Sequence, residues 1–310
     1  NEKGLIASGP VSFAKIYSSL NETLRRGGVY KNGAVVIHMD ADHKDIIEFI
    51  TTPRSQLPWV KRCVDISPGL WNKLENNVKE ALIYGIRSGD IWLNKIKYGR
   101  DGKRIFGNVC LEVYVRSRGT CLLQHINLSA CRARDLKKAF AQGMSELCDL
   151  HGRTGVGGSG EYLAPEIDRQ VGLGMLGLAN FLHIHNVTYE DFANALEHKE
   201  CSPMAQNIVV ELQEAIEAAA YIAKRNNMER AFAIAPTASC SYRSTDLEGF
   251  TATPEIAPPI ATSVDRDSGT FGVQRYEYGD VEIASEVGWD VYKRVADGIM
   301  ILLDNTGLLH

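Results

Sequence analysis

Short apolar runs alternate with stretches of helical periodicity along this chain of 310 residues. Residues 33–39 and 231–235 are apolar runs of a length typical of buried strands. Apolar positions three and four residues apart predict helices, and Thr188 and Ser202 are expected N-caps. The expected helices cover residues 13–24, 67–85, 134–150, 168–184, 188–198, 203–226 and 283–305. This alternation favours an α/β fold in which helices cover the strands, and it leaves open a closed barrel or an open sheet.

Charge and hydropathy exclude two classes of partner. Lys and Arg number 34 against 38 Asp and Glu, so the formal net charge is -4, and the basic residues are spread along the chain. This balance predicts no basic surface for nucleic acid or for an anionic membrane. No apolar run approaches the roughly 20 residues that span a bilayer, and residues 1–10 lack the pattern of a signal peptide. We therefore expect a cytoplasmic protein.

The seven cysteines are odd in number and irregular in spacing, and no two have the C-x-x-C spacing of a zinc site. In a cytoplasmic protein we expect reduced thiols, most of them small buried hydrophobic residues. One or two are candidates for chemistry, and no metal site is expected. The cysteines are Cys63, Cys110, Cys121, Cys131, Cys148, Cys201 and Cys240.

Gly172, Gly174 and Gly177 spell the G-x-G-x-x-G fingerprint of dinucleotide-binding folds. That fingerprint binds pyrophosphate only where a strand turns into a helix. Residues 164–170 resemble the start of a helix, so we expect the glycines within or near one helix. There they would allow a second backbone to pack closely. A nicotinamide dehydrogenase is therefore the weaker interpretation of this segment.

Asn108, Cys110 and Glu112 occupy alternate positions of one short segment. In an extended segment alternate side chains point the same way, so these three would project into one space. An amide, a thiol and a carboxylate are an unusual set to bury for packing alone, because a buried glutamate needs a partner or a raised pKa. The alternative is a strand with a buried cysteine and an outward glutamate, and this segment alone leaves both open.

Two further segments carry reactive or anion-binding residue types. Cys121 follows Cys110 by eleven residues. Residues 235–241 follow a short apolar run and are rich in small hydroxyl side chains. Such a segment can direct N–H groups and hydroxyls at an anion, as the N-terminus of a helix does for phosphate. The alternative interpretation is a simple Ser/Thr turn.

Taken in order, these segments resemble the catalytic subunit of ribonucleotide reductase, and the resemblance extends over essentially all 310 residues. Residues 108–112 match the active-site N-x-C-x-E, and Cys121 with Asn127 and Leu128 resembles the second redox-cysteine segment, C-x-L-x-x-x-N-L. Residues 236–241 resemble the substrate-phosphate loop. Residues 8–13 resemble S-G-P-x-S-F, residues 170–179 resemble the glycine-containing helix, and Gly27, Gly28, Tyr30 and Lys31 lie in a segment that resembles the effector loop.

The resemblance implies a role for each matching residue. Cys110 would become a thiyl radical and abstract the ribose 3′ hydrogen, Glu112 would act as general base on the 3′ hydroxyl, and Asn108 would hold the ribose hydroxyls. Cys121 would be one half of the dithiol that reduces the 2′ position and becomes a disulfide. The substrate would be bound by Leu123, Pro236, Thr237, Ala238, Ser239 and Cys240.

The resemblance also implies a fold, a radical source and partners. The expected fold is α/β, a partial ten-stranded barrel with a central finger loop, forming one incomplete catalytic domain over residues 1–310. The eleven-residue gap from Cys110 to Cys121 resembles the adenosylcobalamin-dependent class. The class served by a diiron or dimanganese subunit carries a longer insertion there, and the glycyl-radical class lacks the N-x-C-x-E setting. Expected partners are a ribonucleotide substrate, a deoxynucleotide effector and a reductant of the thioredoxin or glutaredoxin type.

The chain departs from the family at its ends and in its effector loop. The family places the partner of Cys121 upstream of S-G-P-x-S-F and its shuttle cysteines after the last residue here. We therefore expect a central piece, inactive by itself, that works with the missing parts of the same enzyme. Cys63 is interpreted as a buried strand residue, not as that partner. Tyr30 and Lys31 stand where Arg and small residues are more usual. A non-catalytic nucleotide-binding piece of a split enzyme is the alternative, and a diphosphate or triphosphate substrate stays open.

Overall fold

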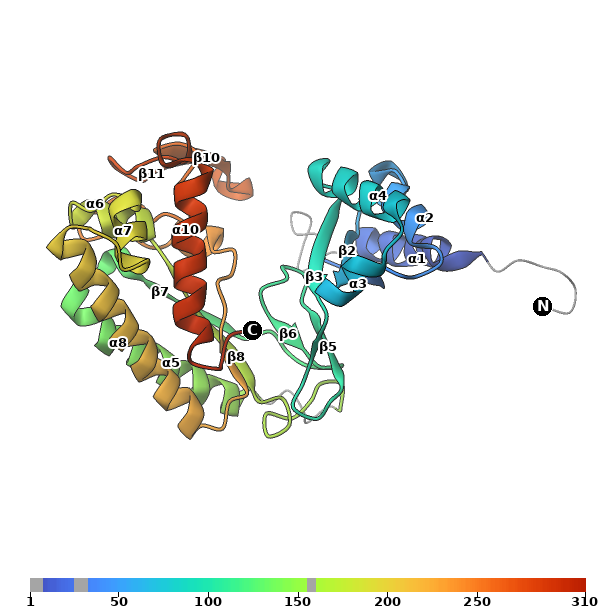
Figure 1. Ribbon diagram of the computed structural model, residues 1–310, viewed down its shortest axis with the longest axis horizontal. Coiled ribbons are helices and arrows are strands. Elements are labelled where there is room, and N and C mark those ends of the chain that lie inside the picture. Colours follow the sequence, from blue (N-terminus) through green and yellow to red (C-terminus); the bar gives the residue numbers. More distant parts are fainter. Residues whose placement is uncertain (1–7, 25–32, 155–159) are drawn as a thin grey trace, which may run out of the picture. The chain divides into compact units, whose positions relative to one another are not determined.

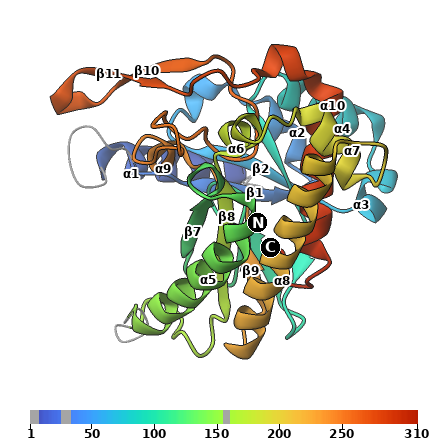
Figure 2. The ribbon, with the colours of Figure 1, turned by 90° about the vertical axis from the view of Figure 1, so that its left-hand side faces the viewer.

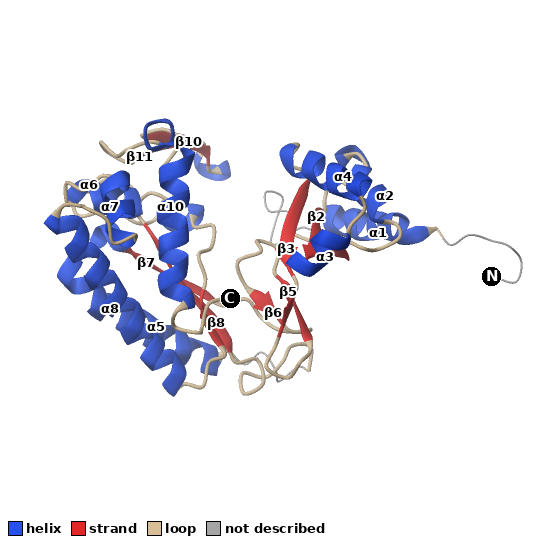
Figure 3. Cartoon of the chain, in the orientation of Figure 1, coloured by secondary structure: helices blue, strands red, loops and turns tan. Residues whose placement is uncertain are grey.

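The chain divides into two compact units, Asn1–Tyr114 and Val115–His310. The structure is a computed structural model that describes residues 8–24, 33–154 and 160–310. Helices and strands alternate within each unit, which confirms the predicted α/β class (Figure 1, Figure 3). The predicted effector-loop residues lie outside the described residues: Gly27, Gly28, Tyr30 and Lys31.

A three-stranded parallel sheet forms the centre of the first unit, in the order β1-β2-β3. Its strands are β1 (Val36–Asp40), β2 (Lys61–Ile66) and β3 (Ile91–Lys95). The helices are α1 (Gly9–Thr23), α2 (Ile46–Thr51), α3 (Pro68–Lys73) and α4 (Asn76–Arg87), with a 3-10 turn η1 (Arg54–Gln56). Helices α2 and α4 follow β1 and β2 in the chain, and they contribute the fully buried Phe49 and Leu82 to the core of this unit.

The helix predicted over residues 67–85 is two helices, α3 and α4. Ser67 caps α3, because its Oγ accepts a hydrogen bond from the backbone N–H of Leu70 at 3.2 Å, so the predicted start is confirmed. Leu74 then adopts an extended backbone and ends α3, and α4 begins at Asn76. The side chain of Leu74 is buried in the core. Because Leu74 is apolar and buried, the sequence pattern of a single helix runs through residue 74, although the helical backbone stops there.

A second, smaller sheet leads from the parallel sheet to the predicted site. Its strands β4 (Lys97–Tyr98), β5 (Arg104–Gly107) and β6 (Tyr114–Val115) pair in the order β4-β5-β6, with β4 and β5 antiparallel. Residues 108–113 connect β5 to β6 and contain Asn108, Cys110 and Glu112. We call residues 108–113 the cysteine loop.

The second unit is built on another three-stranded parallel sheet, in the order β7-β8-β9 (Figure 2). Helices α5 and α8 pack against each other, and α5 also contacts β7 and β8. The core is rich in aromatic residues, with Phe140, Phe181, Phe192 and Phe232 fully buried. The strands are β7 (Leu123–Asn127), β8 (Gln170–Leu176), β9 (Arg230–Phe232) and the antiparallel hairpin β10 (Ser263–Asp267) and β11 (Val273–Glu277). The helices are α5 (Leu136–Arg153), α6 (Leu178–Ile184), α7 (Tyr189–Leu196), α8 (Pro203–Arg225), α9 (Ala238–Ser241) and α10 (Ala284–Asp304), with 3-10 turns η2 (Leu128–Ala130), η3 (Ala133–Asp135) and η4 (Gly269–Phe271).

Two helix starts in this unit are fixed by the side chains that the sequence indicated. The hydroxyl of Thr188 accepts a hydrogen bond from the backbone N–H of Asp191 at 3.1 Å. The hydroxyl of Ser202 does the same for Ala205, also at 3.1 Å. Both satisfy backbone N–H groups that have no partner inside the helix. The predicted N-caps of α7 and α8 are therefore confirmed.

The helix predicted over residues 168–184 is wrong in its first half. Residues 170–176 form strand β8, and all seven are buried. Gly174 is required there, because a Cβ on it would lie 2.2 Å from the carbonyl oxygen of Ala233. The expected close approach of a second backbone therefore exists, but it is between strand β8 and the residue that follows β9. Gly172 and Gly174 lie inside β8 and only Gly177 is at the turn into α6, so the glycines do not form the pyrophosphate-binding turn.

Each unit holds its own parallel sheet of three strands, and within the described residues neither sheet closes into a barrel. The α/β class is thus confirmed at the level of the two units. Helices of the described part of the chain are all too short or too polar to cross a membrane.

Candidate active site

The cysteine loop is a tight loop and not the extended segment that the sequence predicted. The backbone N–H of Asn108 donates to the carbonyl of Val113 at 2.8 Å, and that of Leu111 donates to the carbonyl of Asn108 at 3.0 Å. Leu111 has a φ of 72°, in the left-handed region that reverses the chain. The predicted alternation of side chains along a strand is therefore wrong.

Two of the three predicted residues nevertheless meet across this loop. The side-chain amide Nδ2 of Asn108 donates to Glu112 Oε1 at 2.8 Å. The amide oxygen of Asn108 accepts from the backbone N–H of Val113 at 3.2 Å. Asn108 therefore orients the carboxylate and closes the loop at the same time. The third residue, Cys110, lies between them in the loop and is exposed.

The thiol of Cys110 is held in its protonated form. Desolvation raises its pKa, and the nearby carboxylate of Glu112 raises it further, whereas the ammonium of Lys61 acts in the opposite direction. Because the net direction is upward from an ordinary value of 9.0, the S–H bond is intact at neutral pH. An exposed, protonated thiol beside an oriented carboxylate can give up a hydrogen atom while the carboxylate accepts a proton.

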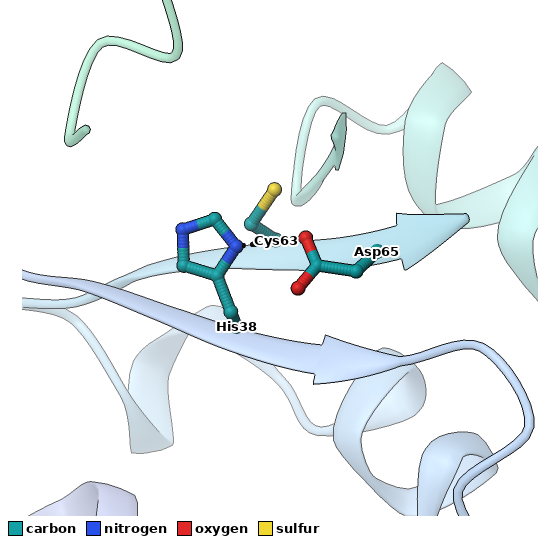
Figure 4. A group of neighbouring side chains, drawn as sticks. All are labelled: His38, Cys63 and Asp65. Carbon is teal, nitrogen blue, oxygen red and sulfur yellow. Dashed lines mark hydrogen bonds and ion pairs between the residues drawn. The ribbon is translucent and has the colours of Figure 1, made fainter. Parts of the chain in front are cut away.

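A polar network lies beside the loop and includes a group with the composition of a metal site. His38, Cys63 and Asp65 bring one potential ligand atom each to within 4.8 Å of one another (Figure 4). The carboxylate of Asp65 already accepts from Asn94 at 2.7 Å and from Arg104 at 2.9 Å, and it contacts His38 Nδ1 at 2.8 Å. Burial raises the pKa of Cys63 to about 12, so its thiol is not a ready ligand. Because the carboxylate of Asp65 is already engaged by Arg104, Asn94 and His38, we interpret the group as a hydrogen-bonded network.

The predicted redox and substrate residues lie in the second unit. Cys121 is exposed just before β7, and Leu123 is the first residue of that strand. Thr237 is 1% exposed, and its hydroxyl accepts from the backbone N–H of Glu255 at 2.7 Å, so it braces the loop from inside. The other predicted substrate residues precede or form the short helix α9, where Pro236, Ser239 and Cys240 are exposed and Ala238 is partly buried.

Comparisons of the whole chain with known proteins point to one family. Residues 2–78 match the family described as "Ribonucleotide reductase, barrel domain". A "Vitamin B12-dependent ribonucleoside-diphosphate reductase" of Mycobacterium tuberculosis is 24% identical over 273 residues, covering 73% of this chain, and the protein of a second strain gives the same values. The alpha subunit of a class Id ribonucleotide reductase from Actinobacillus ureae shares the fold, with a TM-score of 0.57 and 16% identity over 83% of this chain.

The chain is thus similar to ribonucleotide reductases, in sequence over the barrel-domain match and the Mycobacterium tuberculosis relatives and in fold over most of its length. It spans only 36% of the length of the curated reductases that it matches and 54% of the class Id alpha subunit. Because the sequence identity to the alpha subunit is low, the likeness to that protein shows a shared fold and nothing further. This chain thus has an α/β fold of the ribonucleotide reductase type.

Four polar residues beside the cysteine loop were not among the predicted site residues. These are His38, Asp40, Asp65 and Arg104. The sequence holds a signal for His38, Asp40 and Asp65, because polar residues interrupt the apolar segments that form β1 and β2. His38 and Asp40 share one face of β1, and Asp65 pairs with Asp40 on β2. A polar residue at every second position of a buried strand points to a polar network at one face of the sheet.

Proposed function

We propose that the protein of which this chain is a part reduces ribonucleotides to deoxyribonucleotides, with Cys110 as the thiyl-radical residue. The observation that carries the proposal is the contact of Asn108 with Glu112 across the loop that bears the exposed Cys110. The family supports the same reaction, since the Mycobacterium tuberculosis relatives are named ribonucleoside-diphosphate reductases. That name favours a diphosphate substrate over a triphosphate.

The proposed chemistry uses each residue at a stated atom. The sulfur radical of Cys110 takes the hydrogen atom from C3′ of the ribose, and Glu112 takes the proton from the 3′ hydroxyl. The 2′ hydroxyl then leaves as water and a hydrogen takes its place on C2′; the thiol of Cys121 and a partner thiol supply the two protons and two electrons and become a disulfide, and Glu112 returns its proton to the 3′ oxygen. Cys110 returns the hydrogen atom to C3′ and is again a radical. The balance is one ribonucleotide and two thiols to one deoxyribonucleotide, one disulfide and one water.

The remaining predicted residues bind ligands in this proposal. The exposed segment around Ser239, with Thr237 braced beneath it, would hold the substrate phosphates, and Leu123 would contact the substrate. Gly27, Gly28, Tyr30 and Lys31 would report the deoxynucleotide effector. A reductant of the thioredoxin or glutaredoxin type would regenerate the thiol of Cys121. A single barrel domain of ten strands, built from both units and other parts of the enzyme, is the architecture we propose for these contacts.

For the radical source we propose adenosylcobalamin, which supplies a carbon radical when bound. The relatives named vitamin B12-dependent support this source, and the spacing of Cys110 and Cys121 agrees with it. The fold shared with a class Id alpha subunit favours the alternative, a separate metal-containing radical subunit. The exposure of Cys110 fits either source, because each must reach the sulfur from outside the cysteine loop.

The decisive test is Cys110→Ser in the full-length protein, with Cys201→Ser as the matched control. Cys201 lies between α7 and α8 and has no role in the proposed chemistry. Cys110→Ser should abolish deoxyribonucleotide formation without changing the circular dichroism spectrum, and Cys201→Ser should keep it. Turnover by Cys110→Ser would sink the proposal. Nucleotide binding without reduction in the wild type would point instead to a non-catalytic binding piece. Dependence of turnover on added adenosylcobalamin, or on a metal-containing subunit, identifies the radical source.

A further inference from the structure

Two side chains of the parallel sheet contact the backbone on either side of Asn108. His38, on β1, places its Nε2 atom 3.1 Å from the carbonyl oxygen of Gly107. Lys61, on β2, donates from its Nζ atom to the carbonyl oxygen of Val109 at 3.0 Å. Neither residue belongs to a motif by which the family is recognised in this sequence. The two carbonyls bracket Asn108, and the second belongs to the residue before Cys110.

The ring of His38 is fixed in orientation by a buried carboxylate. Its Nδ1 atom lies 2.8 Å from Asp65 Oδ1, and Figure 4 shows the other ring nitrogen turned away from that carboxylate. Asp65 is 1% exposed and cannot shift easily, because Asn94 and Arg104 also donate to it. Both ring nitrogens of His38 therefore face acceptors, one on the sheet and one on Gly107, the residue just before the cysteine loop. A ring with a contact at each nitrogen fixes the distance between Gly107 and the strands β1 and β2.

The ammonium of Lys61 is held from the other side by an aromatic ring. It lies 3.5 Å from the ring centroid of Trp92, on β3, in a cation–π contact. Burial lowers the pKa of Lys61, and the neighbouring Cys110, Cys63 and Glu112 oppose that shift. The charge of Lys61 thus faces the thiol and the carboxylate of the loop while its hydrogen bond fixes the Val109 carbonyl.

We propose that His38 and Lys61 are positioning residues that set the place of the Cys110 thiol through the carbonyls of Gly107 and Val109. This inference rests on the proposed function for its importance, since hydrogen abstraction needs the sulfur at a defined distance from the ribose. The competing role for His38 is purely structural, namely to donate to the buried Asp65. The two roles use different nitrogens of the same ring, and they can be separated.

A matched pair of substitutions at His38 separates them. The amide nitrogen of glutamine reaches about as far as Nε2, so His38→Gln keeps a donor for the Gly107 carbonyl and loses the contact with Asp65. The amide nitrogen of asparagine reaches about as far as Nδ1, so His38→Asn keeps a donor for Asp65 and loses the contact with the Gly107 carbonyl. A positioning role predicts that His38→Gln resembles the wild type and His38→Asn does not. A structural role predicts the reverse.

The first readout does not depend on activity. The backbone N–H groups of Asn108 and Leu111 are bonded within the loop, so their hydrogen exchange reports whether the loop stays closed. In the full-length protein His38→Asn should speed their exchange by about fivefold or more, the effect of losing one hydrogen bond, and His38→Gln by less than about twofold. The turnover number should fall with His38→Asn while the KM for the ribonucleotide stays constant.

Lys61 is tested with Lys61→Met and Lys61→Arg. Lys61→Met keeps the stem and loses both the donor and the charge, so alkylation of Cys110 by iodoacetamide should require a higher pH, read by mass spectrometry of the Cys110 peptide. Lys61→Arg keeps a donor and a charge and should restore the wild-type profile.

The outcomes separate this inference from the proposed function. Exchange in His38→Gln as fast as or faster than in His38→Asn would overturn the positioning role, and an unchanged alkylation profile in Lys61→Met would overturn the part given to Lys61 beside the thiol. If loop exchange and alkylation respond as expected and no ribonucleotide is reduced by the wild type, the positioning role stands and the proposed function fails.

Discussion

Gly107, the last residue of β5, has room for a hydrogen atom and for nothing larger. A Cβ added to it would lie 2.7 Å from Asn94 Oδ1 and 3.0 Å from Leu111 Cδ2. Its backbone is not in the left-handed region, so crowding is the only penalty for Gly107→Ala. Asn94 cannot swing aside freely, because it is 4% exposed and donates to Asp65 at 2.7 Å.

The size of the effect follows from these contacts. Overpacking of this kind costs about 1–3 kcal/mol, and losing a hydrogen bond to a carboxylate costs about 1.5–3 kcal/mol. The crowding can be relieved by a shift of Leu111 or by rotation of Asn94 away from Asp65. By either route, Gly107→Ala should lower the free energy of unfolding of the first unit by about 2 kcal/mol. Movement of Leu111 would also displace the neighbouring Cys110.

Gly69→Ala is the matched control. Gly69 lies in the first turn of α3, and a Cβ on it would meet no atom within 4 Å. Alanine is the better helix former, so this change should be neutral or stabilise by up to about 1 kcal/mol.

Urea unfolding measures both variants through tryptophan fluorescence. Three of the four tryptophans, Trp59, Trp71 and Trp92, are in the first unit, and the fourth, Trp289, is 70% exposed in the second. In a Trp289→Phe background the signal reports the first unit alone. A difference between Gly107→Ala and Gly69→Ala of less than about 0.5 kcal/mol, the usual scatter of neutral surface changes, would refute the crowding argument.

Three other changes test the second unit and the thiols. Gly174→Ala should destabilise the second unit by about 3 kcal/mol, because the Cβ would meet the backbone oxygen of Ala233; urea unfolding followed at Trp289 measures this. Burial lowers the pKa of His125 to about 4, so the unfolded chain binds a proton that the folded unit excludes. Stability should therefore fall by up to about 3 kcal/mol from pH 6.5 to pH 4, and His125→Gln should remove that slope in acid titrations of unfolding. Iodoacetamide at pH 9 should label Cys110 and spare Cys63, which is 0% exposed with its pKa raised to about 12, until the protein is unfolded.

Local rules were reliable where a side chain acts on its own neighbours in the chain. Ser67, Thr188 and Ser202 each satisfy a backbone N–H group three residues ahead, so their helix starts could be placed from sequence. The same rules failed for β8, because a strand that is buried on both faces has no alternating pattern. Its glycines are explained only by the neighbouring strand backbone, which the sequence does not show.

Helix α1 shows a different limit of periodicity. The apolar positions that predicted it, among them Phe13, Ile16 and Tyr17, lie on its exposed face. The face turned to the core of the unit carries Val11, Ala14 and two buried polar residues. The helix was correctly predicted, but the direction of its apolar face relative to the core could not be read from spacing.

The sequence by itself determined the resemblance to ribonucleotide reductases and the candidate site residues, because Asn108, Cys110 and Glu112 match the active-site pattern by their identities and order. Only the tertiary structure decided how they meet. The cysteine loop is closed by hydrogen bonds and a left-handed Leu111, and not by strand alternation. His38 and Lys61, about 70 and 50 residues upstream, contact Gly107 just before the loop and Val109 within it, through carbonyl groups that every residue has. A backbone carbonyl has no signature in the sequence, and its partner is fixed only when β1, β2 and β5 have folded together.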